Sequence, residues 1–114
     1  MKVAVIGGRD FNDYSLMNEV LSKIDISLLV SGGAKGADRL AEKYALEKSI
    51  PTKVFKADWD RHGKSAGYIR NYNIILEADM VVAFWDGISK GTKHGIDLAE
   101  KYKKDLLLIK YSKS

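Results

Sequence analysis

Short runs of consecutive apolar residues alternate with amphipathic stretches along the chain. The runs are rich in Val, Ile and Leu and do not alternate with polar residues. Because a strand of a parallel sheet covered by helices on both sides is buried on both of its faces, continuous runs of this kind predict such strands. Five are present, at Lys2–Ile6, Ser27–Val30, Thr52–Phe55, Met80–Phe84 and Leu106–Ile109.

The stretches between these runs carry apolar residues at helical spacing. They predict four helices, around residues 16–24, 40–45, 64–77 and 96–102. Strands that alternate with helices favour right-handed crossovers, so we expect a Rossmann-like, three-layer α/β domain. Its five-stranded, mostly parallel sheet has the predicted order 3-2-1-4-5. In this topology a crevice opens at the carboxyl ends of the first and fourth strands, and we expect the chemistry there, with help from the second strand.

Composition limits the function classes. The 114 residues predict a single domain over 1–114, and the lack of cysteine excludes disulfides and thiolate metal sites. His62 and His94 are too isolated to predict a metal site. The first apolar run is too short for a signal sequence or membrane span, so we expect a cytoplasmic protein without membrane contact. The net charge of +4 is spread over both halves, which suits phosphate ligands better than duplex DNA.

A glycine-rich loop follows the first predicted strand. It contains Gly7, Gly8, Arg9 and Asp10. Glycines there allow the backbone to approach a ligand, while the arginine can pair a phosphate and the aspartate can accept hydrogen bonds from ribose hydroxyls. The alternative is a tight turn in which Arg9 and Asp10 pair with each other.

A second loop, Ser31–Asp38, follows the second strand and opens a helix. Its candidate ligand-binding residues are Ser31, Gly32, Gly33, Lys35 and Gly36. Successive amides at a helix N-terminus form an anion-binding nest, although the glycine spacing differs from the dinucleotide fingerprint. The alternative is a permissive turn. We interpret Asp38, in the first helical turn, as a carboxylate that caps the helix or interacts with its dipole.

The third candidate region joins the helix before the fourth strand to the loop after that strand. Gly91 and Thr92 are predicted to face a phosphate, unless Ser89 or Thr92 only caps the last helix. Arg70 and Asn71 lie on the preceding helix, and Arg70 is one turn from the small residues Ala66 and Gly67. The alternative for Arg70 is a surface arginine that pairs with Glu77 or another carboxylate.

Taken together, the segments Gly7–Phe11, Ser31–Asp38, Ala57–Trp59, Gly67–Asn71 and Ala83–Thr92 resemble the YspA-like branch of the SLOG superfamily. This resemblance extends from Val5 to about Ala99. It implies a Rossmann-like domain for nucleotides, nucleotide sugars or ADP-ribose-like molecules, often encoded by phages or other mobile elements. It also implies a homodimer and no required cofactor.

Two related families carry part of the pattern. The cytokinin-activating phosphoribohydrolases share an arginine at Arg70 and the Gly91-Thr92 pair, but their catalytic glutamate falls on Gly95 here. The DNA-processing protein A family, which binds single-stranded DNA, has a segment similar to Ser31–Asp38. Whether the chain is an enzyme stays open.

Three hypotheses follow. The first is a binding or sensor domain for a nucleotide-derived, phosphate-bearing ligand. The second is an enzyme that cleaves an N-glycosidic bond of a nucleotide or nucleotide sugar, with Asp10, Asp58 or Asp86 as the catalytic carboxylate. Binding of single-stranded DNA is the third and least favoured.

Overall fold

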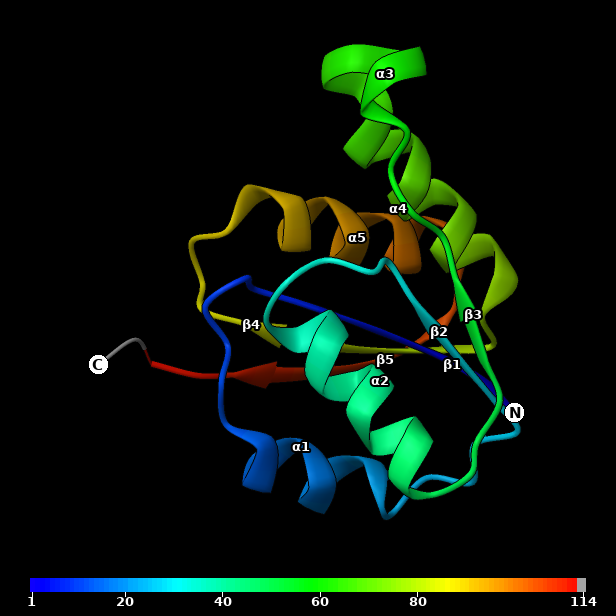
Figure 1. Ribbon diagram of the computed structural model, residues 1–114. Helices are drawn as coiled ribbons and strands as arrows, with labels where there is room; N and C mark the ends of the chain where they lie inside the picture. The colour runs from blue at the N-terminus through cyan, green and yellow to red at the C-terminus, as the bar shows by residue number, and fades with distance from the viewer. Residues whose placement is uncertain (113–114) are drawn as a thin grey trace.

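A five-stranded sheet lies at the centre of the computed structural model, which describes residues 1–112 (Figure 1). Neighbouring strands are all parallel, in the order β3-β2-β1-β4-β5. The predicted order is thus confirmed, and each strand begins and ends within one residue of its predicted bounds. The strands are β1 (Lys2–Gly7), β2 (Leu28–Ser31), β3 (Thr52–Val54), β4 (Met80–Trp85) and β5 (Asp105–Lys110).

Helices cover both faces of the sheet, as the continuous apolar strands predict. In Figure 1, α1 (Tyr14–Leu21) and α2 (Ala37–Glu47) lie on one side, and α4 (Ala66–Glu77) and α5 (Lys90–Lys101) lie on the other. Because side chains alternate across a strand, β1 supplies Val3 and Val5 to one core cluster and Ala4 and Ile6 to the other. Within residues 1–112, no helix is both long and apolar enough to cross a bilayer.

The two edge strands are less buried than the sequence predicts. All three residues of β3 are exposed, and β5 is only partly buried, whereas Val81 to Phe84 of β4 are inaccessible to solvent. The prediction of five buried strands is therefore wrong for β3. The strand β3 pairs with β2 alone. Its three residues lie at the open edge of the sheet, where solvent reaches their side chains.

The segment before α4 also differs from the expected single helix over residues 64–77. A short helix, α3 (Trp59–His62), and a 3₁₀ turn (Gly63–Ser65) precede α4, which begins at Ala66. Asp58 starts α3 because its side chain accepts a hydrogen bond from the amide of Arg61 at 3.1 Å. This turn brings Trp59 back towards α4, at the end of the helix that lies farthest from the sheet in Figure 1.

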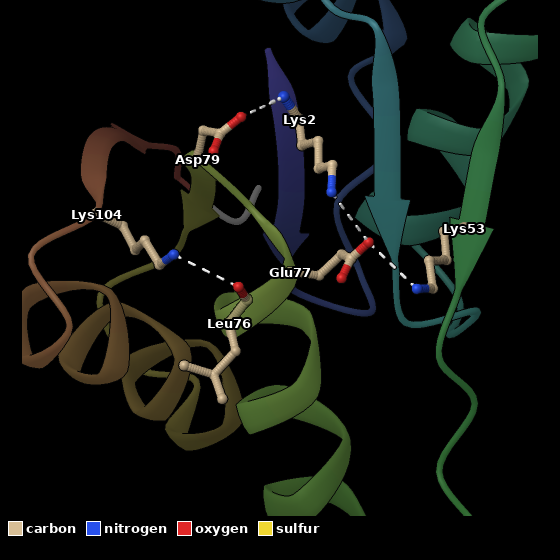
Figure 2. Close-up of polar contacts among 6 residues, drawn as sticks. All are labelled: Lys2, Lys53, Leu76, Glu77, Asp79 and Lys104. Carbon is tan, nitrogen blue, oxygen red and sulfur yellow. Dashed lines mark hydrogen bonds and ion pairs between the residues drawn. The ribbon is translucent and has the colours of Figure 1, made fainter.

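Polar contacts fix the C-terminal end of α4 at the amino edge of the sheet. Figure 2 shows Glu77 between Lys2 of β1 and Lys53 of β3, at 3.6 and 3.2 Å from their ammonium groups. The hydrogen bond from Lys53 and the charge of Lys2 hold the pKa of Glu77 below its usual value. Glu77 therefore pairs with Lys2 and Lys53 and not with Arg70, and the carboxylate that interacts with Arg70 is that of Asp38. Arg70 lies two turns earlier on α4, at the carboxyl edge of the sheet, where the candidate site is found.

Candidate functional site

A cavity of about 570 Å³ lies beyond the carboxyl ends of β1 and β4, where the topology predicts the crevice. This volume is typical of small-molecule sites. We call it the main cavity. Its walls include apolar side chains (Ile6, Ile74, Ile88), three carboxylates (Asp10, Asp38, Asp86) and two cations (Arg9, Arg70). Eight predicted ligand-binding residues line it: Gly7, Gly8, Arg9, Asp10, Arg70, Asn71, Gly91 and Thr92.

A second cavity of about 430 Å³ adjoins the first and has a different character. We call it the basic hollow. Arg9, Ala34 and Arg70 line both spaces, so the two cavities are neighbours. The polar and aromatic side chains of the basic hollow are those of Arg9, Lys35, Arg39, Lys56, Trp59 and Arg70, beside the backbone of Gly32 and Gly33.

Asp38 lies beneath the glycine loop and is 7% exposed. Its carboxylate accepts a hydrogen bond from the amide of Ala34 at 3.1 Å, while Gly36, and not Asp38, occupies the N-cap position of α2. Burial raises the pKa of Asp38 to about 6, although the amide of Ala34 and the charge of Arg70 lower it. Asp38 therefore holds the glycine loop from below. It does not cap α2, but it lies in the first turn of that helix, as the dipole interpretation expects.

Arg70 stands between the two cavities. Its Nη1 donates to the carbonyl oxygen of Gly32 at 3.0 Å, and its Nε donates to Oδ1 of Asn71 at 3.1 Å. These bonds use two of the five N–H donors of the guanidinium. Burial lowers the pKa of Arg70 from its usual value, while the carboxylate of Asp38 raises it. A guanidinium always carries its charge in proteins, so Arg70 presents a fixed cation with donors to spare.

Asn71 connects α4 to the start of α5. Its amide nitrogen lies 3.2 Å from the carbonyl oxygen of Gly91 and 3.2 Å from Nδ1 of His94. Burial lowers the pKa of His94, which favours the neutral ring that can accept this bond. Since both N–H groups of Asn71 are used and its oxygen faces Arg70, the residue positions its neighbours more than it contacts a ligand.

The three candidate catalytic carboxylates are placed differently. Asp10 and Asp86 line the main cavity, whereas Asp58 lines neither cavity and caps α3. Asp10 accepts a hydrogen bond from the phenol of Tyr111 at 2.7 Å. Asp86 accepts from the amides of Ile88 and Ser89, both at 2.8 Å, and so shapes the loop before α5.

Several predicted glycines are explained by packing. A Cβ at Gly7 would lie 2.6 Å from Cβ of Ala37, and one at Gly32 would lie 2.8 Å from Nη1 of Arg70. Gly36 has φ +77°, and its Cα faces the carbonyl of Gly8, which accepts a bond from the amide of Ala37. Gly91 differs, because nothing lies within 4 Å of a Cβ built there. It stands in the main cavity without a packing reason to be glycine.

Ser31 is predicted to bind the ligand but is fully buried. Its hydroxyl donates to Glu42 at 2.7 Å and accepts from the amide of Gly33 at 3.2 Å. Both of its roles are therefore internal to the fold. Ser89 is the N-cap residue of α5 without a side-chain capping bond, and its hydroxyl lies 3.3 Å from that of the buried Thr92.

A side chain at the position of the phosphoribohydrolase glutamate would meet the side chain of Ile6. A Cβ at Gly95 would lie 2.7 Å from Cδ1 of Ile6 on β1. The buried face of α5 packs on the sheet at this point, so a carboxylate here would require the side chain of Ile6 to move. Within residues 1–112, no group of three or more His, Asp or Glu side chains has the arrangement of a metal site.

Of the residues that line the basic hollow, Arg9, Gly32, Gly33, Lys35 and Arg70 were predicted from the sequence, whereas the cations Arg39 and Lys56 were not. Lys56 follows β3 and Arg39 lies on α2, so neither shares a motif with the loops already singled out. One sign was available in the sequence: the carboxyl ends of parallel strands meet at one edge, which places the residues after β3 beside those after β2. No pattern in the sequence predicted that the carboxylate of Asp38 would accept a hydrogen bond from the amide of Ala34 in the glycine loop.

Comparisons with known proteins agree with this architecture. The chain matches the family described as YspA, cpYpsA-related SLOG over residues 1–62. It is 32% identical over 111 residues to the Gene 61 protein of Mycobacterium phage D29, covering 88% of this chain and 89% of that protein.

Two solved structures of DNA processing protein A are similar in fold. The Helicobacter pylori protein, whose single-stranded DNA binding mode has been described, gives a TM-score of 0.73 at 26% identity, and the Streptococcus pneumoniae protein gives 0.82 at 22%. The chain is covered to 95% and 97%, but it spans only 64% and 50% of those two proteins. By the match over its first 62 residues and its phage relative, the chain belongs to the YspA, cpYpsA-related SLOG family.

Proposed function

We propose that this chain is a binding or sensor domain for a nucleotide-derived, phosphate-bearing small molecule. The observation that carries the proposal is Arg70, a part-buried guanidinium that lines both cavities and uses only two of its donors within the protein. Guanidinium groups bind phosphate with paired hydrogen bonds. The two internal bonds of Arg70 leave three of its N–H donors for a ligand in the cavities.

The remaining walls suit the other parts of a nucleotide. Ile6, Ile74 and Ile88 offer apolar surface for a base, and Asp10 offers an acceptor for sugar hydroxyls in the main cavity. The phosphate then lies towards Arg70 and the backbone of the glycine loop, at the boundary with the basic hollow. This orientation places the anionic end of the ligand near most of the cations.

Calorimetric titration with AMP, ADP-ribose and a nucleotide sugar tests the proposal. We expect Arg70→Gln to weaken binding by about tenfold to 100-fold, because a charge-assisted bidentate contact is lost. Arg70→Lys keeps the positive charge but loses the paired N–H donors of the guanidinium. Its affinity should therefore lie between that of the original protein and that of Arg70→Gln. Arg61→Gln is the matched control, since Arg61 is exposed and lines neither cavity. If both Arg70→Gln and Arg70→Lys bind with the same affinity as the original protein, Arg70 is not part of the site.

An enzyme that cleaves an N-glycosidic bond is the second candidate, and the presence of Asp10 and Asp86 in the main cavity favours it. Such a reaction passes through an oxocarbenium-like state that a nearby carboxylate stabilises. We expect release of free base from a nucleotide to stop in Asp10→Asn or Asp86→Asn and to persist in Asp58→Asn, because Asp58 lies outside the cavity. Base release that survives both cavity variants would reject this chemistry, and intact nucleotide after prolonged incubation would leave binding alone.

A further inference from the structure

We infer that the ligand carries at least two linked phosphoryl groups, and that the basic hollow holds the second and later ones. The inference deepens the proposed function and rests on it. It assigns the residues Arg39 and Lys56, which no motif of the sequence singles out, to recognition of a phosphoanhydride chain.

Five cations converge on this hollow from five segments of the chain. Arg9, Lys35 and Lys56 follow β1, β2 and β3, while Arg39 and Arg70 come from α2 and α4. No carboxylate lines the hollow. Within residues 1–112, the ion pairs join Lys2, Lys23, Lys53 and Lys93 to acidic partners, and none involves these five side chains. Like charges that gather repel one another, and the carboxylate of Asp38 lowers this repulsion at Arg70. The arrangement is therefore suited to an anion from outside.

The number and spread of the cations favour more than one phosphoryl group. A single phosphate monoester carries a charge near −2 and is matched by Arg70 and Arg9, which line both cavities. Lys35, Arg39 and Lys56 then lie beyond it, on the side away from the main cavity. Each further phosphoryl group adds negative charge in that direction, which gives these three side chains a partner.

Three kinds of molecule share this chemistry: a nucleoside di- or triphosphate, a nucleotide sugar or ADP-ribose, and a dinucleotide joined through its phosphates. Trp59 bears on the difference, because it lines the hollow and is 53% exposed. An indole at the far end of a phosphate chain can stack on a second base. A dinucleotide should therefore lose affinity in Trp59→Ala, whereas a nucleoside triphosphate should not.

The test is a calorimetric series with AMP, ADP, ATP, diadenosine triphosphate, inorganic tripolyphosphate and a thymidine oligonucleotide. The variant is Arg39→Gln/Lys56→Gln, and the control is Lys48→Gln/Lys101→Gln, which removes two exposed lysines that line neither cavity. We expect affinity to rise from AMP to ATP. The ratio of ATP to AMP affinity should fall by roughly 25-fold in the variant, at about fivefold per cation, and should hold in the control.

The outcomes separate the two proposals. This inference would be overturned if AMP, ADP and ATP bound with equal affinity, and if binding depended on Arg70 but not on Arg39 and Lys56. The proposed function would then still stand. Tripolyphosphate binding that is lost in the variant, with no affinity for nucleotides, would support the hollow and reject the proposed function. Binding of the oligonucleotide alone, or of none of the probes, would overturn both. Urea unfolding of the variant shows whether the fold is intact.

Discussion

Replacing Asp38 with asparagine should make the protein more stable at neutral pH while damaging its site. The carboxylate is almost completely buried beneath the glycine loop, and burial raises its pKa to about 6 from an ordinary value of 3.8. The folded protein therefore holds a proton on Asp38 in a pH range where the unfolded chain has already released it. Asparagine imitates the protonated carboxyl and never has to carry charge in this environment.

The size and sign of the effect follow from proton linkage. Between about pH 3.8 and pH 6 the folded state binds more protons than the unfolded state, so the free energy of unfolding falls as the pH rises through this window. At about 1.4 kcal/mol per pKa unit, a shift of about two units corresponds to roughly 3 kcal/mol lost by pH 7. In Asp38→Asn the oxygen can still accept from Ala34, but the new amide lacks an acceptor, which costs about 1 to 2 kcal/mol. A net gain of about 1 to 2 kcal/mol is expected at pH 7.

Urea unfolding of both proteins at intervals from pH 4 to pH 8 provides the measurement. Other groups titrate in both proteins, so the difference between the two curves isolates Asp38. The difference should be near its lowest at pH 4, grow towards pH 6 and level off above about pH 7. Parallel curves would refute the argument, because they would mean that Asp38 has the same pKa in the folded and unfolded states.

Three further changes have expected outcomes that urea unfolding and nucleotide titration check together. Gly36→Ala should destabilise the fold by about 2 kcal/mol or more, because the residue has φ +77° and a Cβ would overlap the carbonyl of Gly8; an unchanged midpoint would contradict this packing. Gly91→Ala should stabilise α5 by about 0.5 to 1 kcal/mol and weaken ligand binding, since open space in the main cavity surrounds this position; equal affinity would remove Gly91 from the site. Asn71→Ala should cost about 1 to 3 kcal/mol and also lower ligand affinity by releasing Arg70, whereas the exposed Asn73→Ala should do neither.

The sheet could be predicted because its signal is local and redundant. Continuous apolar runs such as Val3–Ile6 identify central strands, and chain connectivity then leaves few topologies. The same rule misjudged the run Thr52–Phe55, which contains β3. Val54 and Phe55 are apolar, but the place of this strand at the edge depends on the order of all five strands. Burial at an edge is a property of the whole sheet, so a single run does not report it.

The candidate site was predicted in outline and missed in detail for a related reason. Arg70, which lines both cavities, could be proposed from the sequence because a cation beside small residues is visible within one helical turn. Ser31 was predicted from a local pattern in the same way. Its hydroxyl, however, bonds to Glu42, which is 11 residues away and cannot be recognised as a partner from the local pattern. Glycines are equally ambiguous. A side chain at Gly7 would clash with Ala37, whereas a Cβ at Gly91 would have no neighbour within 4 Å. Sequence gives the residue type, and only the three-dimensional neighbours separate packing from exposure to a ligand.

Asp38 and the cations of the basic hollow share one physical feature: each is held at a cost to the stability of the fold. A buried carboxylate with a raised pKa and a cluster of like charges both raise the energy of the folded protein, and both lie at the carboxyl edge of the sheet. At the opposite edge, Glu77 meets Lys2 and Lys53 in opposite-charge pairs. Unfavourable electrostatics confined to one edge are typical of a site that a bound ligand completes. A Cβ built at Gly32 would lie 2.8 Å from Nη1 of Arg70 and 2.9 Å from Oδ2 of Asp38. Asp38 also accepts a hydrogen bond from the amide of Ala34, while Arg70 donates to the carbonyl oxygen of Gly32, so the buried carboxylate and the cation hold the same glycine loop.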